Sequence, residues 1–153
     1  MNKPILYIIL FVFVAGCSPR LSPLYRDYEV TAESEVPDAQ VFERIDRGLK
    51  AAGWTMTEGI TDNILATESR QFREWGLYSI EVNLEVAPVG GDYVRMLIHP
   101  YRVYFTGKRS KIPYLRGSLA RSVLKQLHAE FEKEGLTFIG TAQSRDKEAL
   151  GLD

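Results

Sequence analysis

One thiol, that of Cys17, is the only cysteine side chain in the 153 residues of the chain. A thiol is a nucleophile that can take up an acyl or alkyl group. It follows Val14-Ala15-Gly16, whose small side chains let an enzyme approach the backbone closely, and an uncharged apolar run from Pro4 to Ala15 behind the basic Lys3. This run of about a dozen residues suits the core of a secretory signal and falls short of the ~20 residues that span a bilayer. The order of these features predicts that residues 1–16 are a signal peptide and that Cys17 is modified after its removal.

The segment Val14-Ala15-Gly16-Cys17 resembles the lipobox of bacterial lipoproteins, in which an aliphatic residue and two small residues precede the lipidated cysteine. The resemblance implies that Cys17 carries two or three acyl chains, palmitate among them, which suffice for stable membrane anchoring. Ser18 follows the cysteine, where an aspartate would resemble the inner-membrane retention signal of proteobacterial lipoproteins. We therefore expect the chain in the outer membrane, facing the periplasm. The inner membrane, the cell surface and an uncleaved anchor helix are the alternatives.

Elsewhere in the chain, few residues have the spacing typical of a metal-binding site or of a catalytic nucleophile. The two histidines, His99 and His128, have no HxxxH or HxH spacing and no cysteine to join them, so no zinc site is predicted. Ser122-Val123-Leu124-Lys125 matches S-x-x-K, but the S-D-N and K-T-G motifs that accompany it in penicillin-binding proteins are absent from the sequence. We predict no catalytic residues, no metal and no cofactor.

Two carboxylates, Glu81 and Glu85, share one face of a predicted strand. Four strand residues separate them by roughly 13 Å, which exceeds the ~5–9.5 Å between the paired carboxylates of glycosidases. Cross-strand pairing with Arg95 or Arg102 is therefore the role that we expect for them.

The charge distribution is uneven along the chain. Between Tyr93 and Ala129 there are eight Lys or Arg and no Asp or Glu. The predicted anion-binding or partner-binding residues are Lys108, Arg109, Lys111, Tyr114, Arg116 and Arg102. The alternative is that these bases pair with the acid-rich first half of the chain and form a mixed surface. In the predicted compartment the available anions are phospholipid head groups, lipid A phosphates, peptidoglycan carboxylates and acidic protein surfaces. The expected partner is therefore an envelope protein, anionic lipid or lipopolysaccharide, and nucleic acid is excluded by the compartment.

Side-chain periodicity predicts two helices and about four strands. Apolar residues at helical spacing mark helices at residues 37–52 and 118–134. Strict alternation marks strands, of which Leu77 to Ala87 is the clearest. The predicted strands are 54–57, 64–69, 77–87 and 93–105, with a short final strand at 136–140.

The segments between these elements are predicted as connectors. Residues 70–76 form a charged connector and residues 106–117 a basic loop. Pro100 is expected to break the ladder or to sit on an edge or a bulge, and a bulge would shift the alternation that follows it.

The predicted fold class is α+β, a two-layer sandwich of an antiparallel sheet with both helices on one face, in the order α-β-β-β-β-α. The layout is similar to the small helix–meander–helix domains of outer-membrane lipoproteins, BamC-like domains among them. The shared elements are the helix ending at Gly53-Trp54, the strand Ile64-Leu65-Ala66-Thr67 and the closing helix.

Four units follow from these predictions. Residues 1–16 are the signal peptide, 17–36 the lipidated cysteine with a flexible tether, 37–140 the α+β domain and 141–153 a disordered tail. Extended at ~3.3 Å per residue, residues 18–36 allow the domain to stand up to about 60 Å from the membrane.

The functional hypothesis is a membrane-anchored, periplasm-facing lipoprotein that acts as a non-enzymatic binding or structural accessory protein of the cell envelope. Its predicted binding surfaces are the open face of the sheet and the basic loop. An anionic lipid or lipopolysaccharide binder using residues 108–116 is the first alternative. A cell-wall enzyme is the second, and it requires a pocket near His99, Glu81 or Glu85.

Overall fold

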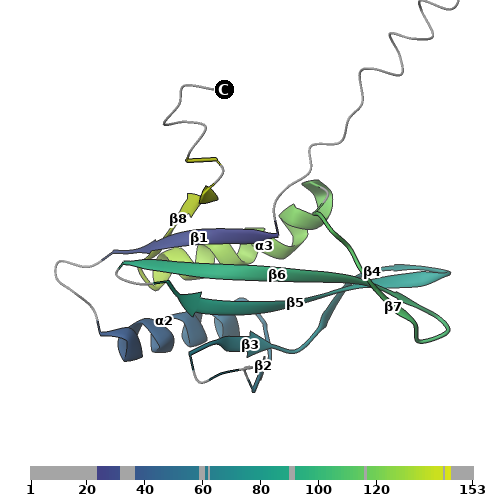
Figure 1. Cartoon of the computed structure of the whole chain (residues 1–153), viewed down its shortest axis with the longest axis horizontal. Coiled ribbons are helices and arrows are strands. Elements are labelled where there is room, and N and C mark those ends of the chain that lie inside the picture. Colours follow the sequence, from purple (N-terminus) through teal and green to yellow (C-terminus); the bar gives the residue numbers. More distant parts are fainter. Residues whose placement is uncertain are drawn as a thin grey trace, which may run out of the picture.

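The structure of the chain, a computed structural model, describes residues 24–145 apart from 32–36, 59–60, 62, 90–91, 116 and 143. Within these residues, two helices and an antiparallel sheet of eight strands form an α+β fold (Figure 1). The helices are α2 (Asp38–Ala51) and α3 (Gly117–Lys133). The strands are β1 (Tyr25–Val30), β2 (Met56–Thr57), β3 (Leu65–Thr67), β4 (Arg70–Trp75), β5 (Tyr78–Pro88), β6 (Tyr93–Tyr104), β7 (Arg109–Lys111) and β8 (Leu136–Gly140).

The long β5–β6 hairpin is the centre of the sheet. The order of neighbours is β2-β3-β5-β6-β1-β8, while β4 pairs with β5 and β7 pairs with β6. Alternate side chains of the hairpin are buried on one face, which α2 and α3 cover with their apolar stripes. The buried residues of the hairpin and the helices are Val82, Leu84, Val86, Val94, Met96, Ile98, Val41, Ile45, Leu49, Leu119, Val123, Leu124, Leu127 and Phe131. The α+β class predicted from the sequence is confirmed.

The sheet is larger than the four strands predicted from the sequence. The additional strands are β1, β4 and β7, which occupy segments that were expected to be tether, connector and loop. All three are short and rich in charged residues, so they lack the apolar alternation by which a strand is recognised. Each pairs with a long strand, β5 or β6, which supplies its backbone hydrogen bonds. This pairing cannot be recognised from the sequence of the short segment alone.

The prediction of a flexible tether over residues 17–36 is wrong for Tyr25–Val30. This segment is β1, which lies between β6 and β8 and places Tyr28 and Val30 in the core. The domain therefore includes Tyr25–Val30 and does not begin at Pro37. The chain from Cys17 to Leu24 spans at most about 25 Å, compared with about 60 Å for the longer tether.

Pro100 lies inside β6 without breaking it, and the bulge expected there is absent from the β5–β6 register. The neighbouring N–H of Ile98 donates to the carbonyl of Leu24 (2.7 Å), and the carbonyl of Pro100 accepts from Ile112 (2.9 Å). Both groups point away from β5, at the junction between the start of β1 and the end of β7. The missing N–H of Pro100 thus removes no hydrogen bond to β5. Because the alternation is unbroken, Arg102 stays on the helix-covered face.

The two helices approach each other closely at Gly48 of α2. A Cβ at this position would lie 2.7 Å from Cδ1 of Phe131, whose ring is fully buried. Gly→Ala inside a helix ordinarily stabilises a protein by about 0.5–1 kcal/mol. Gly48→Ala is expected instead to lower the free energy of unfolding by about 1–3 kcal/mol, because the ring has no room to shift.

Urea denaturation measures this effect. Gly117→Ala is the matched control, since its added Cβ would meet no described atom within 4 Å beyond its chain neighbours and the backbone of its own helix. The double variant Gly48→Ala/Phe131→Leu should recover part of the loss. A Gly48→Ala chain as stable as the wild type would contradict the close approach.

Candidate functional site

One end of the sheet projects past the helices as an arm (Figure 1). The arm consists of β4, β7, the start of β5 at Tyr78–Ile80 and the end of β6 at Tyr101–Tyr104. One face of the arm continues the open face of the sheet, and its other face continues the helix-covered face. Of the residues that were predicted to bind a partner, Arg102, Lys108, Arg109 and Lys111 lie on this arm and Tyr114 lies on the segment that follows it.

On the open face, acidic and basic side chains form pairs. His99 Nε2 lies 3.0 Å from a carboxylate oxygen of Glu85. Arg109 lies 3.7 Å from the carboxylate of Glu81, donates to Ser69 Oγ (3.1 Å) and stacks over the ring of Tyr101 at 4.3 Å. The expected pairing of the two glutamates with Arg95 or Arg102 is therefore wrong. The bulge-free register places Arg102 on the opposite face, and Arg95 binds another carboxylate.

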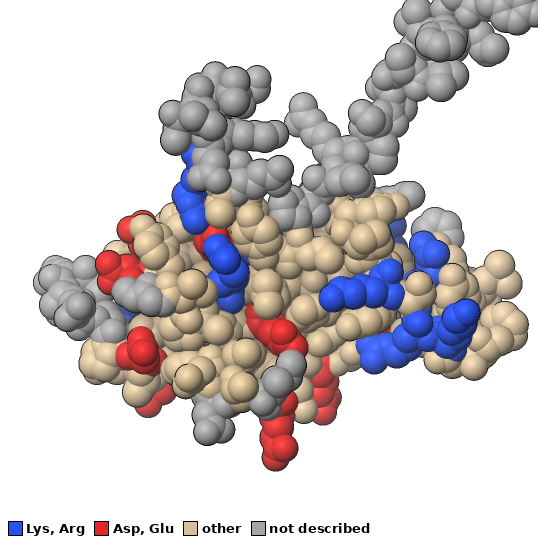
Figure 2. Space-filling model, in the orientation of Figure 1, with Lys and Arg blue, Asp and Glu red and all other residues tan. Residues whose placement is uncertain are grey.

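Lys108, Arg109 and Lys111 form a basic edge along β7 and the turn before it. All three are exposed, and within the described part of the chain Lys108 and Lys111 make no ion pair. Figure 2 shows Lys and Arg side chains gathered at this end of the molecule. Pairing with the acidic half of the chain thus accounts for Arg109 and leaves the two lysines available.

Two large apolar side chains are exposed at the arm tip, which we define as the adjoining turns around Leu77 and Phe105. Leu77 is 70% exposed and Phe105 is 81% exposed. The turns are joined by a hydrogen bond from the N–H of Phe105 to the carbonyl of Leu77 (3.4 Å). The arm tip therefore presents an apolar pair beside the basic edge.

On the other face of the arm, Arg102 and Tyr114 line a cleft of about 150 Å³ against the first turn of α3. We call it the arginine cleft, and its lining is Arg73, Tyr78, Ile80, Arg102, Ile112, Tyr114, Ser118 and Leu119. Arg102 donates to the Tyr104 hydroxyl (3.4 Å), and this hydrogen bond holds the pKa of Arg102 above its ordinary value. The predicted binding set is thus divided between two faces. Cys17 and Arg116 lie outside the described residues.

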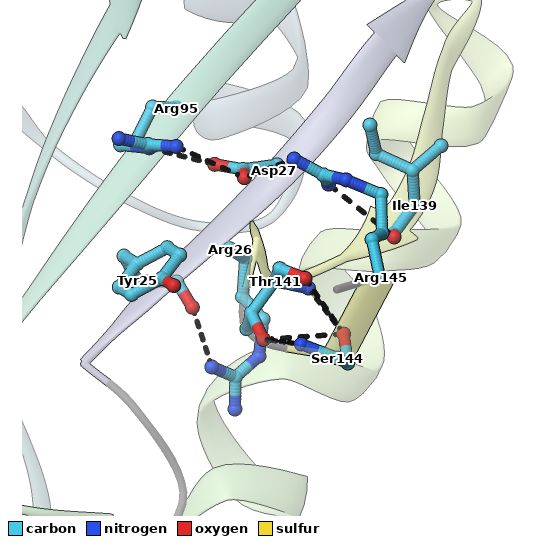
Figure 3. A network of polar contacts seen from close by, with 8 residues as sticks. All are labelled: Tyr25, Arg26, Asp27, Arg95, Ile139, Thr141, Ser144 and Arg145. Atoms are coloured by element: carbon cyan, nitrogen blue, oxygen red, sulfur yellow. Dashed lines mark hydrogen bonds and ion pairs between the residues drawn. The ribbon is translucent and has the colours of Figure 1, made fainter. Parts of the chain in front are cut away.

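A buried carboxylate, that of Asp27 in β1, joins the two ends of the domain (Figure 3). Its side chain is 3% exposed and accepts two hydrogen bonds from Arg95 (2.8 and 3.1 Å) and one from Arg145 (2.9 Å). Burial alone would raise the pKa of Asp27, but the hydrogen bonds and charges of the two arginines hold this pKa below its ordinary value. We call these three residues the clasp.

The clasp corrects the prediction that residues 141–153 are a disordered tail. Thr141 and Ser144 bond to each other through backbone and side chain, and Arg145 then reaches Asp27. Residues 141, 142, 144 and 145 are therefore part of the domain, whose described end lies beyond the predicted boundary at residue 140. Residues 146–153 lie outside the described part of the chain.

Asp27→Asn is expected to lower the free energy of unfolding at neutral pH by about 2 kcal/mol. The estimate follows from the ~1.5–3 kcal/mol of hydrogen bonds to charged groups, taken low because both arginines are more than one third exposed. Asp46→Asn, which removes the exposed pair between Asp46 and Lys50, is the control and should cost less than about 0.5 kcal/mol. Equal losses in both variants would show that the clasp contributes nothing.

The lowered pKa of Asp27 makes the stability of the fold depend on pH. Because the pKa of Asp27 is lower in the folded chain than the ~3.9 of an unfolded aspartate, the unfolded chain takes up the proton more readily. The stabilisation is complete above about pH 5 and is lost as the pH falls through the folded value. The stability difference between wild type and Asp27→Asn should therefore shrink below about pH 4, as measured by urea titrations across this range.

His128 faces the core side of β1, away from the arm. Its Nδ1 lies 3.1 Å from the buried hydroxyl of Tyr28. Burial and the charge of Arg26 hold the pKa of His128 below its ordinary value, and burial raises that of Tyr28. Among the described residues, no group of three His, Cys, Asp or Glu side chains is placed to bind a metal ion. Nor does any described helix have the length and apolarity to cross a membrane.

Sequence reasoning missed Arg73, Tyr78 and the clasp. Arg73 reaches the cleft because the β4–β5 register shifts between Gln71 and Arg73, so that Arg73 faces the same way as Ile80. Because β4 was predicted as a connector, there was no reason in the sequence to expect a register shift within it. The alternation through Tyr78 and Ile80 was visible, and carrying it unbroken through Pro100 would have placed Arg102 beside them.

Comparison with known proteins adds no relative to this description. No protein-family model matches the chain, and a search of curated proteins returns no significant match.

Proposed function

We propose that the chain is a lipid-anchored, periplasm-facing protein of the bacterial outer membrane that acts as a non-enzymatic binding or structural accessory protein of the cell envelope. The order of basic start, apolar run and Val14-Ala15-Gly16-Cys17 supports the anchor. The resemblance to BamC-like lipoprotein domains predicts the α+β class that the chain has, although its sheet is larger than the four strands on which the resemblance was drawn.

A binding role is favoured over catalysis because acidic side chains and His99 on the open face are engaged in pairs with other side chains. Glu85 and His99 pair with each other, Glu81 pairs with Arg109, and Asp27 is enclosed by two arginines. Two clefts lie on the arm, and the lining of neither includes His99, Glu81 or Glu85. The cell-wall enzyme alternative required a pocket at those residues.

The observation that carries the proposal is the combination of exposed apolar and basic side chains at the arm tip and the basic edge. There the basic edge (Lys108, Arg109 and Lys111) adjoins the exposed side chains of Leu77 and Phe105. Exposed apolar groups beside positive charge form a surface that gains by contact with an anionic partner. The open face of the sheet, whose charges are paired, is the weaker candidate surface.

Charge reversal of the basic edge tests the proposal. Lys108→Glu/Lys111→Glu is expected to abolish the main crosslinked species of the lipoprotein in intact cells, because the variant repels an anionic partner. Lys50→Glu/Lys133→Glu makes the same charge change on the two helices, away from the arm, and should leave the crosslinks unchanged. Identical crosslinks in all three proteins would remove the arm from the proposed function.

Anionic lipid is a second candidate partner, favoured by the exposure of Leu77 and Phe105. Apolar side chains beside Lys and Arg suit the boundary between headgroups and acyl chains. The unlipidated domain, residues 18–153, should then float with vesicles that contain phosphatidylglycerol at low salt and be released as salt rises. Leu77→Ser/Phe105→Ser should reduce this binding. An absence of vesicle binding at low salt would leave an envelope protein as the partner.

A further inference from the structure

The arginine cleft brings two positive charges together without a carboxylate to balance them. Arg73 comes from β4 and Arg102 from β6, and both line the same space. Within the described part of the chain neither forms an ion pair, and Arg102 donates a hydrogen bond to the neutral Tyr104 hydroxyl. The Nε of Arg102 is buried and has no hydrogen-bond partner among the described atoms. Half-buried guanidinium groups without a counter-charge are costly, which favours an anion as the missing partner.

The remaining lining suits an anion attached to an organic group. Ser118 and Leu119 belong to the first turn of the 17-residue helix α3, where free backbone N–H groups favour negative charge. No acidic residue occupies that turn to neutralise it. Apolar and aromatic surface from Ile80, Ile112 and Tyr114 forms the rest of the wall.

The arrangement also restricts where the anion binds. The guanidinium of Arg102 lies over the ring of Tyr78 at 4.9 Å, which fixes its plane against the cleft wall. The register shift in β4 turns Arg73 toward the same space, a use to which bulges beside binding sites are commonly put. Planar guanidinium forks match the oxygens of phosphate better than single ammonium charges do.

We propose that the arginine cleft is a binding site for the phosphate group of a small phosphomonoester, held by Arg73, Arg102 and the first turn of α3. Inorganic phosphate and the headgroup of a phosphorylated lipid share this chemistry. The cleft lies on the face of the arm opposite the basic edge, so the proposal does not depend on the proposed function.

Calorimetric titration of the full-length chain in a non-ionic detergent tests the site with three probes: inorganic phosphate, phenyl phosphate and dihexanoyl phosphatidic acid. Phenyl phosphate is expected to bind more tightly than inorganic phosphate, because its ring covers the apolar wall. Tightest binding of phosphatidic acid would assign the site to a lipid headgroup, and equal binding of all three would assign it to free phosphate. Absence of binding by every probe at millimolar concentration would overturn the proposal.

Two variants locate the binding. Arg73→Gln and Arg102→Gln should each weaken phenyl phosphate binding about tenfold or more, the scale of one charge-assisted hydrogen bond. Lys125→Gln, which removes an exposed positive charge of α3 that belongs neither to the cleft nor to the basic edge, is the control and should bind within about twofold of the wild type. Should Arg102→Gln fail to fold, Arg73→Gln alone decides the outcome. A folded Arg73→Gln chain that binds like the wild type would exclude the cleft.

Discussion

A fragment that begins at Pro37, the domain boundary predicted from the sequence, is expected not to fold. It lacks β1, which pairs with β6 on one side and β8 on the other. Removing β1 leaves β8 without a neighbour in the sheet and takes Tyr28, a fully buried side chain, out of the core. The loss of one large aromatic side chain from a core costs about 3–5 kcal/mol, which is comparable to the whole stability of a small domain.

Circular dichroism and urea titration distinguish the outcomes. Residues 18–153 should unfold cooperatively, whereas residues 37–153 should show no cooperative transition and should expose apolar surface to a hydrophobic dye. A synthetic peptide of residues 24–31, added in excess, should restore part of the native signal by occupying the gap between β6 and β8. A cooperative transition in 37–153 alone would contradict the role of β1 in the core.

Cys17→Ala is expected to abolish incorporation of labelled palmitate into the chain completely. The thiol is the proposed acceptor of the lipid, and the sequence holds no second cysteine to replace it. Metabolic labelling followed by gel electrophoresis measures the effect. Label that persists in the variant would contradict the lipobox resemblance.

Ser18→Asp is the matched control for the anchor. It leaves Cys17 in place and introduces the residue that resembles a retention signal. Palmitate incorporation should be unchanged, while the protein moves from the outer to the inner membrane on density-gradient fractionation. If the variant stays in the outer membrane, the proposed sorting rule does not apply to this chain.

The parts of the fold that were predictable from the sequence are those with long apolar periodicity. Strand β5 alternates over eleven residues and α3 repeats its apolar positions over seventeen, so burial alone identifies them. The face of β6 beyond Pro100 was misassigned because a proline inside a strand predicts an interruption. Only the tertiary arrangement, with the start of β1 and the end of β7 beside Pro100, shows that no hydrogen bond is lost.

The clasp and the arginine cleft were not predictable, for a related reason. Asp27 and Arg145 are separated by 118 residues, and a charged residue in a short polar segment is ordinarily a solvated one. Their pairing follows from the position of β1 between β6 and β8, which no local pattern encodes. The basic composition of residues 93–129 was visible, but the division of its members between two faces depends on strand register.

If Cys17 is the anchor, the position of β1 at Tyr25–Val30 lowers the affinity for the membrane that the arm requires, because few residues separate β1 from Cys17. Leu24 meets β6 beside Ile98, and β1 then runs antiparallel to β6, so the chain enters the domain from the side on which the arm projects. A connection of at most about 25 Å holds the arm near the bilayer at an effective concentration of headgroups in the millimolar range or above. Contacts with intrinsic dissociation constants of millimolar order would then be occupied most of the time. With the proposed anchor, avidity would make a weak and rapidly reversible binding surface sufficient for persistent attachment.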